Sequence, residues 1–123
     1  MSKEKPRVYT EAEIPAKLQA DGLADWKLED GWLRRKYNTD GWRSTLMLVN
    51  AIGFLAEAAD HHPDLAVTYA KVWVKLQTHS AGGITDKDFA LAQEIEKFIL
   101  WQPKPDSPLT GVSGDKVFVQ GKK

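Results

Sequence analysis

Apolar and polar residues recur with a helical period near the start of the chain. A weak apolar face predicts a short helix that begins at about Thr10 or Ile14 and ends at Ala20. Thr10 and Glu13 have the spacing of a capping box, in which each side chain bonds the backbone N–H of the other residue. Pro15 is compatible with this helix if it occupies the first turn.

Two segments have the period of β-strands. The first, WKLEDGWLRRKY, places Asp30 and Gly31 between two short runs, which is typical of a hairpin because glycine tolerates a positive φ. The second, LAVTYAKVWVKLQTH, predicts two further strands. Its alternation places Val72, Val74 and Leu76 on one face.

From Trp42 to about Asp60 the period is helical again, but apolar residues occur on two sides of the predicted helix. One side carries Leu46, Val49, Gly53 and Ala56, and the other carries Leu48, Ile52 and Leu55. A helix that is apolar nearly all round cannot pack on one sheet and leave its other side in water. We therefore expect a homodimer or homotetramer built on this helix. A charge at Leu48 or Ile52 should dissociate it.

The last predicted helix begins at Thr85 and ends at about Leu100. Its apolar stripe consists of Phe89, Leu91 or Ala92, Ile95, Phe98 and Ile99. The order α-β-β-α-β-β-α predicts an α+β domain in which a four-stranded antiparallel sheet carries helices on one face. We expect a flexible leader over residues 1–9, the domain over residues 10–100, and a Pro/Gly-rich tail over residues 101–123 that docks through KVFV.

The composition suits one globular domain, since 123 residues are 42% hydrophobic and 28% charged. Lys plus Arg equal Asp plus Glu at 17 each, which argues against direct nucleic-acid binding through bulk positive charge, although a local patch could escape the count. Without cysteine, disulfides, thiol nucleophiles and thiolate metal sites are excluded. No secretory signal or membrane span is visible, so we expect a reduced cytoplasmic setting and no membrane contact.

All three histidines of the chain lie close together in sequence, at His61, His62 and His79. Proline disfavours the α conformation in the residue before it, so Pro63 should end the long helix at about His62. Glu57 precedes His61 by four residues and could orient that ring on the same helix face. If the last strand and the last helix pack as expected, the imidazoles can converge at the edge of the sheet.

The residues themselves leave three interpretations of these histidines open. They could cap a helix on the surface, or bind zinc, or act in general acid-base catalysis near neutral pH. Zinc is disfavoured because adjacent residues at a helix end diverge and no thiolate is present. For Asp88, the spacing from Thr85 is that of a helix start.

The spacing of several residues resembles the signature of the pterin-4a-carbinolamine dehydratase family. The matching residues are Glu57, His61, His62, Pro63, Tyr69, His79 and Asp88. The resemblance covers roughly residues 10 to 100 and includes Trp26 before the first predicted strand. The chain departs from the family pattern at two places, Ala70-Lys71 and the tail after Trp101. Neither place involves the histidines. We expect Tyr69 in the core.

The resemblance implies loss of water from 4a-hydroxytetrahydropterin to give quinonoid dihydropterin, within tetrahydrobiopterin recycling, with no cofactor or metal. It implies His61 and His79 as the acid-base pair and His62 in substrate binding and polarisation. Glu57 and Asp88 would support them. The segment Gln77, Thr78, His79 and Ser80 would pair its backbone with the amide-like edge of the pterin, and Asp60 would lie beside the site.

The same resemblance leaves other functions open. An aromatic amino acid hydroxylase would be the pathway partner that supplies the substrate. Some relatives resemble partner proteins more than enzymes, one as a dimerisation cofactor of a transcription factor, and others are connected with molybdopterin metabolism. The complete set of histidines favours catalysis, because a pure scaffold does not need them.

Overall fold

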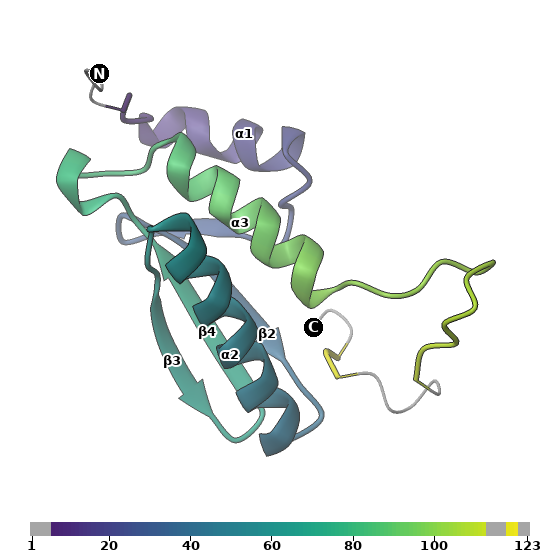
Figure 1. Cartoon of the computed structure of the whole chain (residues 1–123). Helices are drawn as coiled ribbons and strands as arrows, with labels where there is room; N and C mark the ends of the chain where they lie inside the picture. Colours follow the sequence, from purple (N-terminus) through teal and green to yellow (C-terminus); the bar gives the residue numbers. More distant parts are fainter. Residues whose placement is uncertain (1–5, 113–117, 121–123) are drawn as a thin grey trace.

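The computed structural model describes residues 6–112 and 118–120 and contains the predicted order of elements (Figure 1). The elements are η1 (Glu11–Glu13), α1 (Ile14–Ala20), β1 (Lys27–Glu29), β2 (Trp32–Asn38), α2 (Trp42–Ala59), β3 (Asp64–Thr68), β4 (Lys71–Leu76), η2 (His79–Ala81) and α3 (Asp86–Ile99). The capping box of Thr10 and Glu13 forms, and Pro15 lies in the first turn of α1. Both features confirm the prediction.

The strands form one antiparallel sheet in the order β1-β2-β4-β3, and the helices cover one face of it, as predicted (Figure 1). In the central pair, Leu33 lies opposite Leu76, and both side chains point to the helices. The β1–β2 turn has positive φ at Asp30 (54°) and Gly31 (84°). These two values are those of a turn whose twist matches the strands that it joins.

Tyr69 does not lie in the core, so that expectation is wrong. Thr68 pairs with Lys71, which places Tyr69 in the two-residue turn between β3 and β4, and its side chain is 69% exposed. A turn residue points away from both faces of the sheet, so the alternation of the strands does not apply to it.

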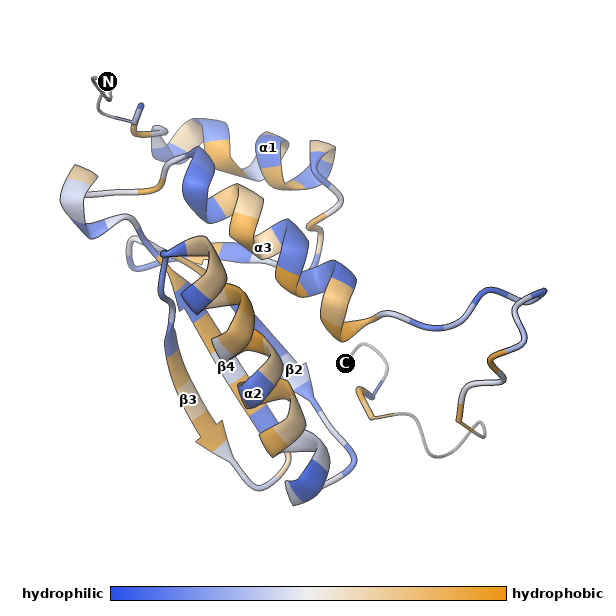
Figure 2. Ribbon diagram, in the orientation of Figure 1, coloured by the Kyte–Doolittle hydropathy of each residue, from blue (hydrophilic) through white to orange (hydrophobic). Residues whose placement is uncertain are grey.

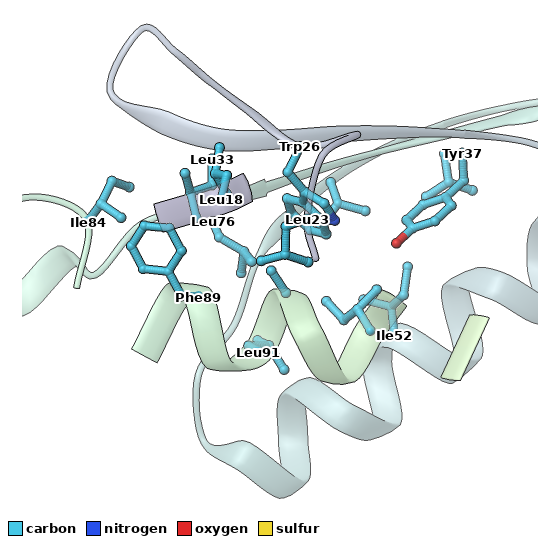
Figure 3. Close-up of a cluster of buried hydrophobic side chains, with 14 of the residues drawn as sticks. Leu18, Leu23, Trp26, Leu33, Tyr37, Ile52, Leu76, Ile84, Phe89 and Leu91 are labelled. Carbon is cyan, nitrogen blue, oxygen red and sulfur yellow. The ribbon is translucent and has the colours of Figure 1, made fainter. Parts of the chain in front are cut away.

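The core lies between the sheet and the three helices (Figure 3). Leu33, Tyr37 and Leu76 point from the sheet toward the helices, while Ile52 and Phe89 point from α2 and α3 toward the sheet. Val72, Val74 and Leu76 are each fully buried, as their alternation predicts. In α3 the predicted stripe is correct except at Phe98, which is 52% exposed near the end of the helix.

The two faces of α2 differ from the prediction. Leu48, Ile52 and Ala56 are buried at 4% exposure or less, so they form the side that packs on the sheet. The exposed apolar residues of α2 are Trp42, Leu46, Met47 and Phe54. Figure 2 shows the outward side of α2 with much apolar colour. The periodicity reveals two apolar faces but cannot tell which one meets the sheet. A charge at Leu48 or Ile52 would therefore enter the core.

Helix α2 ends at Ala59, not at His62. Asp60 adopts a left-handed conformation (φ 54°), and the backbone N–H groups of Asp60 and His61 donate to the carbonyls of Glu57 and Ala56. These two bonds form a Schellman motif, which ends a helix before any effect of Pro63 is needed. The two histidines consequently lie beyond the helix, in the segment that leads into β3.

A partly buried carboxylate connects α3 with the sheet. Glu96 accepts hydrogen bonds from Trp26 Nε1 (3.0 Å), from Arg35 Nε and a terminal nitrogen (both 3.1 Å), and from Tyr37 Oη (2.6 Å). Burial alone would raise the pKa of Glu96, but the donors Arg35, Tyr37 and Trp26 outweigh it, so the pKa lies below its usual value.

Tyr9 and Val119, from the predicted leader and the predicted tail, both contact the domain. Tyr9, in the predicted leader, packs edge-on against Phe89 and bonds Asp86. In the tail, Val119 pairs with Thr39 next to β2, so docking through this part of KVFV is confirmed. Lys116 and Val117 lie outside the described residues. Within the part of the chain that the structure describes, no helix is long and apolar enough to cross a bilayer.

Candidate active site

His61 is held by a buried carboxylate from another element. Its Nε2 lies 2.7 Å from Oδ1 of Asp88, which is in the first turn of α3 and is fully buried. A carboxylate accepts, so Nε2–H donates and Nδ1 keeps a free lone pair. The side chain of His61 retains 13% exposure. This arrangement fixes the tautomer and the direction of the ring.

Asp88 is itself positioned by two hydrogen-bond donors, from Thr78 and Thr85. Its Oδ2 accepts from Thr78 Oγ1 (2.7 Å) and from the backbone N–H of Thr85 (2.9 Å). The hydroxyls of Thr78 and Thr85 also bond each other at 2.8 Å. The prediction that Asp88 starts the helix is therefore confirmed by its capping box with Thr85. The same carboxylate uses its other oxygen to contact His61.

Glu57 contacts His62 and not His61, so its predicted partner is wrong. His62 Nε2 lies 2.9 Å from Glu57 Oε1, and both side chains are exposed, at 55% and 83%. The i, i+4 rule placed Glu57 beside His61, but it holds only within a helix, and α2 ends before His61. The two adjacent histidines thus face different carboxylates.

His79 lies at the start of η2, next in sequence to Thr78. Its ring makes a T-shaped contact with Trp32, with 5.7 Å between centroids and an interplanar angle of 79°. Nζ of Lys75 lies 4.5 Å from the centroid of the same indole. His79 is exposed, so its nitrogens can reach a ligand from solvent.

The structure brings the three histidines to one end of the sheet by way of Asp88. His61 bonds Asp88, Asp88 bonds Thr78, and His79 follows Thr78. His62 adjoins His61 in the sequence and pairs with Glu57. Among the described residues, no hydrogen bond joins one imidazole directly to another.

The segment 77–80 differs from its predicted role in one respect. The N–H of Thr78 donates to the Gly83 carbonyl at 2.9 Å, and the Thr78 carbonyl accepts from Gly82 at 3.0 Å. The backbone of Thr78 is therefore engaged within its own loop. The Gln77 side chain bonds the Gly31 carbonyl at 3.0 Å, while Ser80 is exposed. Asp60 is exposed at the end of α2.

Sequence reasoning missed Trp32 as a neighbour of His79. The signal was present in the hairpin register, because Trp32 follows the Asp30-Gly31 turn directly and lies one position beyond the pair of Leu33 with Leu76. Gln77 is therefore its opposite neighbour, two residues before His79. The pairing order of β2 and β4 was needed to see this.

No metal site accompanies these residues. In the ranges 6–112 and 118–120, no group of three histidine, aspartate or glutamate side chains is arranged to hold a metal ion. The arrangement can do proton chemistry with its own side chains: an imidazole oriented by a buried carboxylate, and a second imidazole open to solvent.

Comparisons with known proteins cover most of the chain. Residues 7–98 match the model of the family described as pterin 4 alpha carbinolamine dehydratase. Two proteins that carry the name pterin-4-alpha-carbinolamine dehydratase are each 42% identical: one from Aquifex aeolicus, over 76% of this chain and 92% of that protein, and one from Chloroflexus aurantiacus (strain J-10-fl), over 76% and 98%.

A solved structure has the same fold. The crystal structure of a transcriptional coactivator/pterin dehydratase from Brucella melitensis superimposes with a TM-score of 0.67 at 28% identity, covering 73% of this chain and 96% of that one. The match of sequence and fold extends over most of the chain, and the histidine segments lie within it. The chain therefore belongs to the pterin 4 alpha carbinolamine dehydratase family.

Proposed function

We propose that the protein removes water from a 4a-hydroxytetrahydropterin and gives a quinonoid dihydropterin. The observation that carries the proposal is the contact of His61 with the buried Asp88, at the same end of the sheet as His79. The family supports a pterin as substrate. By the family resemblance, the substrate comes from an aromatic amino acid hydroxylase that uses tetrahydropterin, within tetrahydrobiopterin recycling.

The reaction needs only proton transfers. The bond between C4a and the hydroxyl oxygen breaks, and this oxygen leaves as water after it receives one proton. The lone pair of N5 forms the new C=N bond, and N5 loses its proton. One group donates and another accepts, no electron is gained or lost overall, and transfer back through water restores both groups.

His61 and His79 form the acid-base pair of the proposal. Asp88 holds His61 with Nε2–H toward the carboxylate, which leaves Nδ1 as the atom that exchanges a proton with substrate. Asp88 also stabilises the imidazolium that forms when Nδ1 accepts a proton. His79, which is open to solvent, is the second group of the proposal that exchanges a proton with the substrate. His62, paired with Glu57, contributes to binding and polarisation of the substrate.

The proposal assigns the flat pterin to the end of β4. Strand β3 begins at Asp64 opposite Lys75, so β4 continues beyond its neighbour toward Gln77. A planar ring with amide-like donors and acceptors can pair there as a strand would. Because the backbone of Thr78 is engaged, the proposal assigns this pairing to Gln77, His79 and Ser80, with Asp60 beside the histidines.

The test is dehydration of 4a-hydroxytetrahydropterin, produced in the cuvette by a hydroxylase, with and without the purified protein. We expect a rate well above that of buffer. The double variant His61→Ala/His79→Ala, purified in the same way, controls for contaminating enzymes. A wild-type rate equal to that of buffer would contradict the proposal.

A second role, as a partner of another protein or of a second copy, is favoured by one observation. The outward side of α2 exposes Trp42, Leu46, Met47 and Phe54. Contiguous apolar surface on a helix is typical of an interface. We propose that copies of the chain associate through this face into a homodimer or homotetramer. In the non-catalytic alternative, another protein binds the same face.

A further inference from the structure

The face of the sheet opposite the helices concentrates positive charge. Alternation along the strands places five cationic side chains on it: Lys27, Arg34, Lys36, Lys71 and Lys75. Two carboxylates, Glu29 and Asp64, lie on the same face, and two more border it: Asp30, 3.7 Å from Arg34, and Asp25, which lines a hollow in its surface. A chain whose net charge is zero thus has an uneven distribution, with an excess of cations on this open sheet face.

The register arranges three of these cations side by side. Lys27 lies opposite Arg34, and Arg34 lies opposite Lys75, so the three form a row across β1, β2 and β4. Asp64, opposite Lys75, ends the row at β3. In the next row toward the β3–β4 turn, Lys36 lies opposite Trp73.

Two indoles lie on either side of the cation row. Trp32, on β2, lies one row before the cation row. Trp73, on the adjacent strand β4, lies one row after it. Strand geometry separates their Cα atoms by roughly 14 Å. Trp73 and Arg34 both line two hollows of about 590 Å³ and 550 Å³ in the surface. A ligand can therefore approach the Trp73 ring from two sides.

The cations of this face are weakly compensated by the protein. Among the described residues, no ion pair holds Lys36, Lys71 or Lys75, whereas Lys27 pairs with Glu29 at 3.8 Å and Nζ of Lys75 lies over the Trp32 ring. Arg34 lies 3.8 Å from Glu29 and 3.7 Å from Asp30, beyond hydrogen-bond distance. Its buried Nε has no hydrogen-bond partner in the described part of the chain. Because this Nε is buried, a phosphate would instead meet the unpaired ammonium groups of Lys36 and Lys71.

We propose that the open sheet face binds single-stranded nucleic acid, with phosphates along the cations and bases stacked on the indoles. A sheet with upright aromatic side chains offers π-faces to unpaired bases, whereas a duplex keeps its bases stacked inside. A small anion could use the cation row but would not need two indoles roughly 14 Å apart. The inference does not depend on the dehydratase activity.

The experiment is a fluorescence-anisotropy titration of a labelled oligothymidylate, long enough to cross the four strands, at several salt concentrations. We expect binding that weakens as salt rises. The double variant Lys36→Ala/Lys71→Ala should reduce the slope of log K against log salt by about 0.7 for each phosphate that a lysine no longer neutralises. Trp73→Ala should weaken binding roughly five- to a hundredfold, and Trp73→Phe should retain most of it.

The matched control is Lys87→Ala/Lys97→Ala, which removes two exposed lysines from α3 on the other side of the molecule. It should bind like the wild type. A duplex of the same length and inorganic polyphosphate serve as competitors, and both should compete less well than the unlabelled single strand. Circular dichroism of each variant checks the fold, and Trp73→Phe keeps the test valid if Trp73→Ala is unstable.

Three results would overturn the inference: no binding at low salt, equal weakening in the control and in Lys36→Ala/Lys71→Ala, or polyphosphate competing as well as the single strand. The last result would mean attraction of any polyanion without stacking of bases.

Discussion

The two oxygens of Asp88 have different tasks. Oδ2 closes the start of α3 through Thr85 and Thr78, and Oδ1 holds the ring of His61. One buried carboxylate thus couples local folding to the direction of an imidazole. The sequence could predict the first task from the spacing of Thr85 and Asp88, because a capping box is local. It could not predict the second, because α2 and α3 meet only in the fold.

Asp88→Asn tests the second task. With its oxygen kept on Thr85 and Thr78, the new amide would direct N–H groups at His61 Nε2 and force the proton onto Nδ1. The capping box would survive, but Nδ1 could no longer accept a proton. We expect kcat to fall roughly 10²-fold or more, with KM and the melting temperature changed little. A proportional loss of stability and kcat would instead indicate a structural role alone.

The elements follow largely from local signals. The two hairpins, the Thr85 start of α3 and the burial of Val72, Val74 and Leu76 were predictable, because turn chemistry and alternation act over a few residues. The end of α2 was not, since a left-handed Asp60 ends the helix before Pro63. Because the helix ends two or three residues before His62, Glu57 pairs with His62 and not with His61.

The contact of α3 with the sheet through Glu96 has a consequence for acid stability. The pKa of Glu96 is lower in the folded protein, where Arg35, Tyr37 and Trp26 bond its carboxylate, than in an unfolded chain. The stabilisation is fully present above the usual glutamate pKa of about 4.3 and is lost as pH falls through the lower folded value.

Glu96→Gln should reduce the loss of stability at acid pH. It should also lower the free energy of unfolding at neutral pH by about 1–3 kcal/mol. Denaturant unfolding at a series of pH values measures both effects. The control is Glu94→Gln, a more exposed neighbour that pairs with Lys97. If the two variants had the same pH dependence, the role of the Glu96 network would be refuted.

The whole molecule leaves one helix face without a partner among the described residues. Phe54 is 67% exposed on α2, and Trp42, Leu46 and Met47 are exposed on the same helix. Full burial of such a side chain is worth about 1.5–3 kcal/mol, which is enough for several of them to drive association. Periodicity predicted that α2 has a second apolar face, but only the fold shows which residues form it.

Phe54→Glu should therefore shift the protein from oligomer to folded monomer in light scattering. Leu48→Glu should unfold it, because Leu48 lies in the core at 4% exposure. Phe98→Glu, which places the same charge at an exposed site on α3, should leave the assembly intact. A wild-type protein that is monomeric at micromolar concentration would remove the prediction of assembly.

The most direct test of the account is the turnover of His61→Ala and His79→Ala, measured separately on 4a-hydroxytetrahydropterin. Both residues lie outside the core, so each variant should keep the circular dichroism spectrum and the assembly of the wild type. Each should lose roughly 10²- to 10⁴-fold in kcat, the usual contribution of one positioned proton transfer. Near wild-type turnover in either variant, with a normal spectrum, would contradict the claim that these two imidazoles carry the protons.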